Sequence, residues 1–173
     1  MDPIMLVLRL FHVVAGALWF GSAFLFTGFV GPAAAETVPS SGPIMSAVVK
    51  KRRVARVITW LAITTVVAGW LMWVKNAMGY PSIGDWVTSS FGLVLTIGGV
   101  LATLAAYIGI TGIGQNVERL VEIGDQVAAS GGPPTPEQGA LMARLGAEIE
   151  RHGKIDLVLL FLAVIAMATA RYW

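Results

Sequence analysis

Four long apolar segments constrain what this chain can fold into. They cover approximately residues 4–30, 54–75, 91–114 and 154–172, and each contains few charged side chains. A helix needs roughly 20 such residues to cross the hydrocarbon core of a bilayer. Because lipid offers no hydrogen-bond partners, a spanning segment must pair its backbone internally, which favours helices. The sequence therefore predicts an all-α integral membrane protein, a four-helix transmembrane bundle in which residues 1–173 form a single domain.

Composition supports this class and excludes several others. Charged residues make up 13% of the chain, against about 25% in soluble domains. The absence of cysteine excludes disulfides and thiolate metal sites. No phosphate-binding glycine loop, nucleophile elbow or HExxH zinc motif indicates a catalytic class, so whether the protein is an enzyme stays open. The basic cluster from Lys50 to Arg56 is typical of contact with anionic lipid rather than with nucleic acid.

The ends of the apolar segments predict how the helices are connected. Gly31-Pro32 is typical of a helix end, and the apolar run before it is too long for a cleaved signal peptide, so we expect it to be a true first span. The third helical pattern continues beyond its apolar segment to the GGPPTPEQ hinge. Thr135 there predicts an N-cap, with Pro136 at the first helical position. Spans three and four should therefore extend as a helical hairpin of residues 115–153. Its expected apolar seam is Leu120, Val121 and Val127 against Leu141, Leu145 and Ile149.

The distribution of basic residues predicts the orientation. All but three of the 12 Lys and Arg residues lie in the connection between spans one and two or in the hairpin; the exceptions are Arg9, Lys75 and Arg171. The positive-inside rule then places the hairpin in the cytoplasm and both termini outside. We expect a multi-pass protein of the bacterial cytoplasmic (inner) membrane, surrounded by the lipid bilayer. The aromatic residues expected at the outer interface are Tyr80, Trp86, Tyr172 and Trp173.

Small residues recur at three- and four-residue spacing along the third span. They are Gly98, Ala102, Ala105 or Ala106, Gly109 and Gly112. Such a face lets helix backbones approach closely in lipid. Two interpretations remain open. The face forms a contact inside the bundle, or it joins a homodimer or a larger membrane complex through Gly98, Ala102, Gly109 and Gly112.

Arg9 and His12 are the only titratable residues in the first apolar segment. Three positions apart, they share a helix face, and a charge in hydrocarbon costs at least about 2.5–3.5 kcal/mol. This face should therefore turn inward. Three interpretations of His12 stay open: a hydrogen bond between helices with Arg9 reaching the outer interface, an axial haem or copper ligand, and a proton relay.

Methionine supplies the candidate partners of His12. Five of the seven methionines fall at the outer side of this topology, among them Met72 and Met167, and thioether sulfur suits haem iron and Cu(I). Arg9 and Arg171, on the same side, could hold haem propionates. The alternative is that methionine only fills space between helices.

The second histidine lies in a different place. His152 begins span four at the inner side, and roughly 30 Å of hydrocarbon separates it from His12, so one iron cannot bind both. The run EIERHGKID around His152 predicts a solvated helix face that includes Asp156.

Three short motifs carry a resemblance to known proteins. They are His12, Trp19 and Gly21 in HVVAGALWFG; Arg52, Arg53 and Arg56 followed by Gly69-Trp70; and the ending IAMATARYW. With them the chain resembles small bacterial membrane proteins of the copper-resistance D-like type, the HemJ-type protoporphyrinogen oxidases and a group of uncharacterised predicted membrane proteins. The resemblance implies a four-helix bundle with His12 as a haem or metal ligand. The long hairpin and the lack of a second intramembrane histidine differ from HemJ.

These observations lead to one expected function and two alternatives. We expect a haem b-binding membrane protein or cytochrome-like subunit that serves electron transfer or haem chemistry. Its axial ligands would be His12 and either Met167 or Met72, and its propionate partners Arg9 and Arg171. The alternatives are a non-catalytic scaffold or accessory subunit of a larger membrane complex, and copper handling at the same histidine and methionines.

Overall fold

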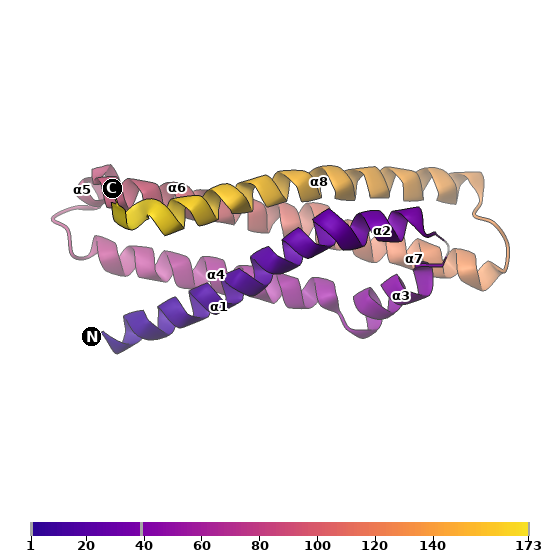
Figure 1. Cartoon of the computed structure of the whole chain (residues 1–173), viewed down its shortest axis with the longest axis horizontal. Helices are drawn as coiled ribbons and strands as arrows, with labels where there is room; N and C mark the ends of the chain where they lie inside the picture. Colours follow the sequence, from indigo (N-terminus) through magenta and orange to yellow (C-terminus); the bar gives the residue numbers. More distant parts are fainter. Residues whose placement is uncertain (1, 39, 173) are drawn as a thin grey trace.

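Four long helices run side by side along the length of the molecule (Figure 1). They are α1 (Pro3–Leu25), α4 (Val54–Ala77), α6 (Ser90–Ile108) and α8 (Pro136–Thr169). The computed structural model describes residues 2–38 and 40–172, and in these ranges there is no β-strand. All four helices belong to continuous helical segments that are long and apolar enough to cross a membrane. The predicted all-α membrane bundle is confirmed.

Successive long helices are antiparallel, so the connections gather at two ends of the bundle. The two termini and the short α5 (Ile83–Thr88) lie at one end, called here the terminal end (Figure 1). The short helices α2 (Gly31–Glu36) and α3 (Gly42–Ser46) lie at the opposite end with the turn between α7 and α8, called here the hairpin end.

Spans three and four do extend into a helical hairpin. Helix α6 continues through the π-helical segment η3 (Gly109–Gly114) into α7 (Gln115–Ser130). Gly131 then ends α7 in the left-handed conformation, with φ of 68°, which glycine adopts without steric cost. Thr135 caps α8 as predicted: its hydroxyl accepts from the backbone N–H of Gln138 at 3.2 Å, and the Gln138 side chain accepts from the Thr135 N–H at 3.0 Å. This reciprocal capping box fixes the start of α8.

The first helix does not end at Gly31-Pro32, so that prediction is wrong. The π-helical segment η1 (Phe26–Val30) follows α1, and α2 continues to Glu36. In η1 the backbone N–H of Gly31 donates to the carbonyl of Phe26, five residues earlier. Pro32 falls in the first turn of α2, where its missing N–H costs little. The wider π-helical turn thus allows the helix to continue beyond Pro32.

The small-residue face of the third span packs inside the bundle. A Cβ on Gly98 would lie 3.1 Å from Cε of Met167, and one on Gly112 would lie 2.8 Å from Nδ1 of His152, both on α8. Gly109 likewise faces Asp156 of α8. These glycines therefore form a contact inside the bundle, since α8 of the same chain fills the space above them.

Trp86 is not an interfacial residue as predicted. Its side chain is fully buried and packs among aromatic rings at the terminal end, with ring centroids 5.0 Å from Tyr80, 5.7 Å from Phe91 and 6.1 Å from Trp73. Helix α5 folds back over the bundle and carries the indole inward. Tyr80 and Tyr172 are exposed, and Trp173 lies outside the described residues.

The apolar seam of the hairpin forms as expected. Leu145 and, between the predicted positions, Ile123 are buried, and the other predicted seam residues are half-buried. The connection between spans one and two docks on the same hairpin, because Lys50 pairs with Asp125 of α7 at 2.6 Å and Ser46 donates to the same carboxylate at 3.1 Å.

Candidate metal site and a second polar cluster

A small cavity lies where all four long helices meet, toward the terminal end. Its volume is about 60 Å³. The predicted residues His12 of α1, Met72 of α4 and Met167 of α8 all line it. Gly69, Trp70, Trp73, Asn76, Leu95 and Gly99 complete the lining. The structure thus brings together one imidazole and two thioethers from three helices.

The imidazole of His12 is held in one orientation by the backbone of α4. Its Nδ1 lies 2.8 Å from the carbonyl oxygen of Thr65. A carbonyl only accepts hydrogen bonds, so Nδ1 carries the hydrogen and donates it. In the neutral imidazole Nε2 then keeps its lone pair, which is the state in which histidine binds metals.

Two glycines let His12 approach α4 so closely. A Cβ on Gly69 would lie 2.9 Å from Cε1 of His12, a distance that side chains do not adopt. A Cβ on Gly16, one turn along α1, would lie 3.2 Å from the Thr65 methyl group. The close contact of α1 and α4 therefore depends on small residues, as expected for helices packed in lipid.

Two indoles form much of the cavity wall, and their polar atoms are engaged elsewhere. Nε1 of Trp70 donates to Thr103 Oγ1 at 3.0 Å, and Nε1 of Trp73 donates to Thr96 Oγ1 at 2.8 Å. Among the lining residues, the only other polar side chains are His12 and Asn76, and the amide of Asn76 takes no part in these hydrogen bonds. The donors available to a ligand are therefore few and mostly soft.

The two arginines predicted to hold propionates lie elsewhere. Arg9 is exposed, and Arg171 is exposed with its guanidinium 5.4 Å above the ring of Tyr172. Neither lines the cavity.

The cavity is small compared with most ligand sites. Sites for organic ligands typically measure roughly 300–1,000 Å³, whereas one water needs about 10–15 Å³. At about 60 Å³ the cavity is of the size that a single ion and its contacts need. The donor set of imidazole and thioether matches a soft ion such as Cu(I).

A second polar cluster lies near the hairpin end, and here the predicted solvated face is wrong. Asp156 is only 3% exposed, and its Oδ1 has no hydrogen-bond partner among the described residues. His152 is half-buried, with Nδ1 buried and also without a partner. Both side chains turn toward η3, because Gly109 and Gly112 leave space for them.

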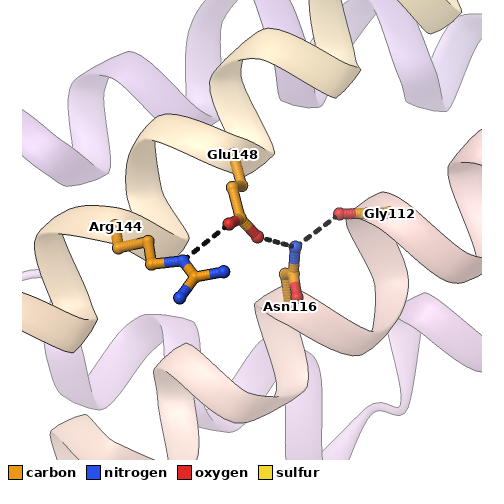
Figure 2. Close-up of polar contacts among 4 residues, drawn as sticks. All are labelled: Gly112, Asn116, Arg144 and Glu148. Atoms are coloured by element: carbon orange, nitrogen blue, oxygen red, sulfur yellow. Dashed lines mark hydrogen bonds and ion pairs between the residues drawn. The ribbon is translucent and has the colours of Figure 1, made fainter.

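Next to His152 the cluster continues to the surface of the hairpin. Figure 2 shows Glu148 of α8 between two donors: Arg144 Nε donates to Oε1 at 2.9 Å, and Asn116 Nδ2 donates to Oε2 at 3.1 Å. Asn116 also donates to the Gly112 carbonyl at 2.9 Å (Figure 2). The carboxylate thereby joins α8 to the junction of η3 and α7.

The sequence contains a signal for this cluster that the charge pattern obscured. Arg144, Glu148, His152 and Asp156 follow one another at intervals of four residues, which places all four on one face of α8. We call them the polar ladder. Glycines on the facing helix, Gly109 and Gly112, mark where the ladder turns inward.

The chain was compared with protein-family models, with curated proteins and with solved structures, and none of the three comparisons gives a match. The class of protein is therefore defined by the fold alone: a multi-pass, all-α membrane bundle.

Proposed function

We propose that this protein binds a soft metal ion, copper(I), inside the bundle and serves in copper handling at the membrane. One observation carries the proposal: His12, Met72 and Met167 come from three helices and line one small cavity. Imidazole and thioether together are donors that suit Cu(I). In this proposal the bound ion supplies one-electron or ion-transfer chemistry.

The chain's own contribution would be to orient and shield the ligands. The bond from His12 to Thr65 fixes the tautomer of the neutral imidazole so that Nε2 is the nitrogen that would bind the metal, and such outer contacts typically change metal affinity by about 10–100-fold. The indoles of Trp70 and Trp73 form part of the cavity wall beside these ligands.

Copper binding by the purified full-length chain tests the proposal. Detergent-solubilised protein is loaded with Cu(I) under reducing conditions and titrated with a competing chelator. We expect a stoichiometric complex that is lost in His12→Ala and weakened in Met72→Leu and Met167→Leu, since leucine keeps the volume but removes the sulfur. Met78→Leu is the matched control, because Met78 is 81% exposed. Equal copper affinity in wild type and His12→Ala would rule the proposal out.

An absorption spectrum of the same preparation tests haem b. A Soret band that disappears in His12→Ala would support haem, with helix separation making room for it, and would replace the copper proposal. If the preparation has neither a Soret band nor bound copper, the scaffold interpretation remains, in which the bundle supports a larger membrane complex.

The orientation is part of the proposal. The hairpin end carries most of the basic side chains, and the positive-inside rule then places it in the cytoplasm of a bacterial cell, with both termini outside the inner membrane. The metal cavity would then lie in the outer half of the bilayer.

A further inference from the structure

We propose that the polar ladder of α8 is a proton path, which carries protons between the hairpin end and the carboxyl group of Asp156 inside the bundle. The proposal rests on two of the three buried side-chain atoms that lack a partner among the described residues, Asp156 Oδ1 and His152 Nδ1; the third, Trp86 Nε1, lies at the terminal end. It is independent of the metal site.

Two unpaired polar atoms at one place call for a ligand that can satisfy both. A buried polar group without a partner costs about 1–3 kcal/mol, and such groups in proteins usually bind an ordered water. Residues four apart on a helix have Cβ atoms about 5–6 Å apart, a separation that one water can bridge. A metal ion does not match the site, because no group of three or more His, Cys, Asp and Glu side chains among the described residues is placed to hold one.

Exposure along the ladder runs from solvent to interior. The side chains of Arg144 and Glu148 are 76% and 35% exposed, His152 is half-buried, and Asp156 is 3% exposed. Arg144 and Asp156 are twelve positions apart, which corresponds to about 18 Å along a helix axis. The ladder therefore connects the surface of the hairpin to a buried carboxyl group inside the bundle.

The elements packed against α8 bring no competing charge to Asp156. Segments η1 and η3 contain no titratable residue, and η3 presents Gly109. The groups on the other elements are exposed or engaged elsewhere. Asp125 pairs with Lys50, and His12 lies in the metal cavity. The exposed groups are Tyr107 of α6; Glu118, Arg119 and Glu122 of α7; Arg9 of α1; Arg171 and Tyr172 at the C-terminal end; and Glu150, Arg151 and Lys154 of α8. His152 is thus the titratable partner nearest along the ladder.

The transfer step is a plain proton exchange. Imidazolium His152 gives up its Nδ1 proton through the bridging water; an N–H bond breaks and an O–H bond forms on the Asp156 carboxylate. Neutral His152 then regains its Nδ1 proton from a hydronium ion of the solvent beside Glu148 at the hairpin end, which leaves a neutral water, and the imidazole ring turns between the two sides. The small residues Gly109 and Gly112 keep this route open, because a Cβ at Gly112 would meet Nδ1 at 2.8 Å.

Infrared spectroscopy of the full-length chain in nanodiscs tests the path. We expect a carbonyl stretching band of a protonated carboxylic acid that titrates with pH, shifts in D₂O and is absent in Asp156→Asn. Asp156→Glu should keep the band at a shifted frequency, which guards against a variant that fails to fold. Glu150→Gln is the matched control, because Glu150 is exposed on the same helix and pairs with Lys154.

Exchange kinetics then separate a path from an isolated buried acid. After a jump into D₂O, His152→Gln should slow the shift of the Asp156 band by roughly tenfold or more, since positioned proton donors accelerate transfer by about 10²–10⁴-fold. Two results would overturn the proposal: a carboxyl band that survives Asp156→Asn, or equal exchange rates in wild type and His152→Gln.

Discussion

Gly69 shows how much of the candidate metal site depends on a missing side chain. The imidazole of His12 lies against its Cα, close enough that a Cβ would come within 2.9 Å of Cε1. On the same helix, Thr65 offers the carbonyl that receives the Nδ1 hydrogen. Neither residue is a ligand, but together they determine where the ligand's free nitrogen lies.

Gly69→Ala should therefore impair the site without removing any ligand. The added methyl group pushes the ring away from the Thr65 carbonyl, and we expect copper affinity to fall by roughly 10–100-fold, as for loss of an outer contact. Chelator competition measures this fall. Gly21→Ala on α1 is the control, because nothing lies within 4 Å of its Cβ position. Unchanged affinity in Gly69→Ala would show that the position of the ring is not important for binding.

At the scale of elements, the start of α1 is tied to the end of α4. Asp2 caps α1 by accepting from the backbone N–H groups of Ile4 and Met5 at 3.0 and 3.3 Å, and its second oxygen pairs with Lys75 of α4 at 2.6 Å. The hydrogen bond from Lys75, followed by the backbone bonds, lowers the pKa of the Asp2 carboxyl below its usual range.

This tie predicts a small loss of stability in acid. Because the folded-state pKa is lowered, the stabilisation is present above the unfolded-state pKa and is lost as the pH falls through the folded-state value. Asp2→Asn keeps a capping oxygen but removes the charge, so it should unfold with a weaker dependence on pH below about 4. Thermal unfolding in detergent at several pH values measures this. The difference should shrink in high salt, since the pair is partly exposed. Identical acid dependence in both proteins would contradict the assignment.

The π-helical segments η1 and η3 determine which residues face α8. Both lie on helices that contact α8 near the inner part of the polar ladder. A Cβ at Gly153 of α8 would lie 3.0 Å from the hydroxyl of Thr27 in η1. Such widened turns occur often at functional sites, and here they bring small and polar residues to α8 where its own polar face turns inward.

At the scale of the whole molecule, the bundle places its two polar regions at different depths. The cavity lined by His12 lies toward the terminal end, whereas the polar ladder enters from the hairpin end. If the basic hairpin end is cytoplasmic, the first region is nearer the outside and the second is reached from within the cell.

Cysteine labelling tests this orientation directly, because the chain contains no cysteine. Ser40→Cys, in the connection at the hairpin end, should react with a membrane-impermeant maleimide only after the cells are opened. Pro81→Cys, in the connection beside α5 at the terminal end, should react with intact cells. Both positions are exposed, so access to the reagent depends on the side of the membrane. The reverse pattern would invert the proposed topology.

Much of the fold follows from the sequence, because apolar length, helix caps and charge are local properties. The four apolar segments predict the four long helices, and Thr135 predicts the start of α8. The predicted end at Gly31-Pro32 was wrong because the π-helical turn before Pro32 changes the hydrogen-bond pattern, so that the helix continues past the proline. Similarly, Trp86 is buried because α5 folds back onto the bundle, a contact between elements that no local pattern contains.

The candidate sites likewise depend partly on local sequence and partly on helix packing. His12 stands out in the sequence as an imidazole in an apolar segment, and Met72 and Met167 as soft donors on the same side of the predicted topology. Only the packing of four helices decides that these three line one small cavity and that both arginines lie outside it. Asp156 was assigned to solvent because neighbouring charges suggested a wet surface. It is buried because burial depends on the facing helix, where Gly109 makes room for the carboxyl group. The sequence determines which residues carry the chemistry, and the distances between helices determine which of them can act together.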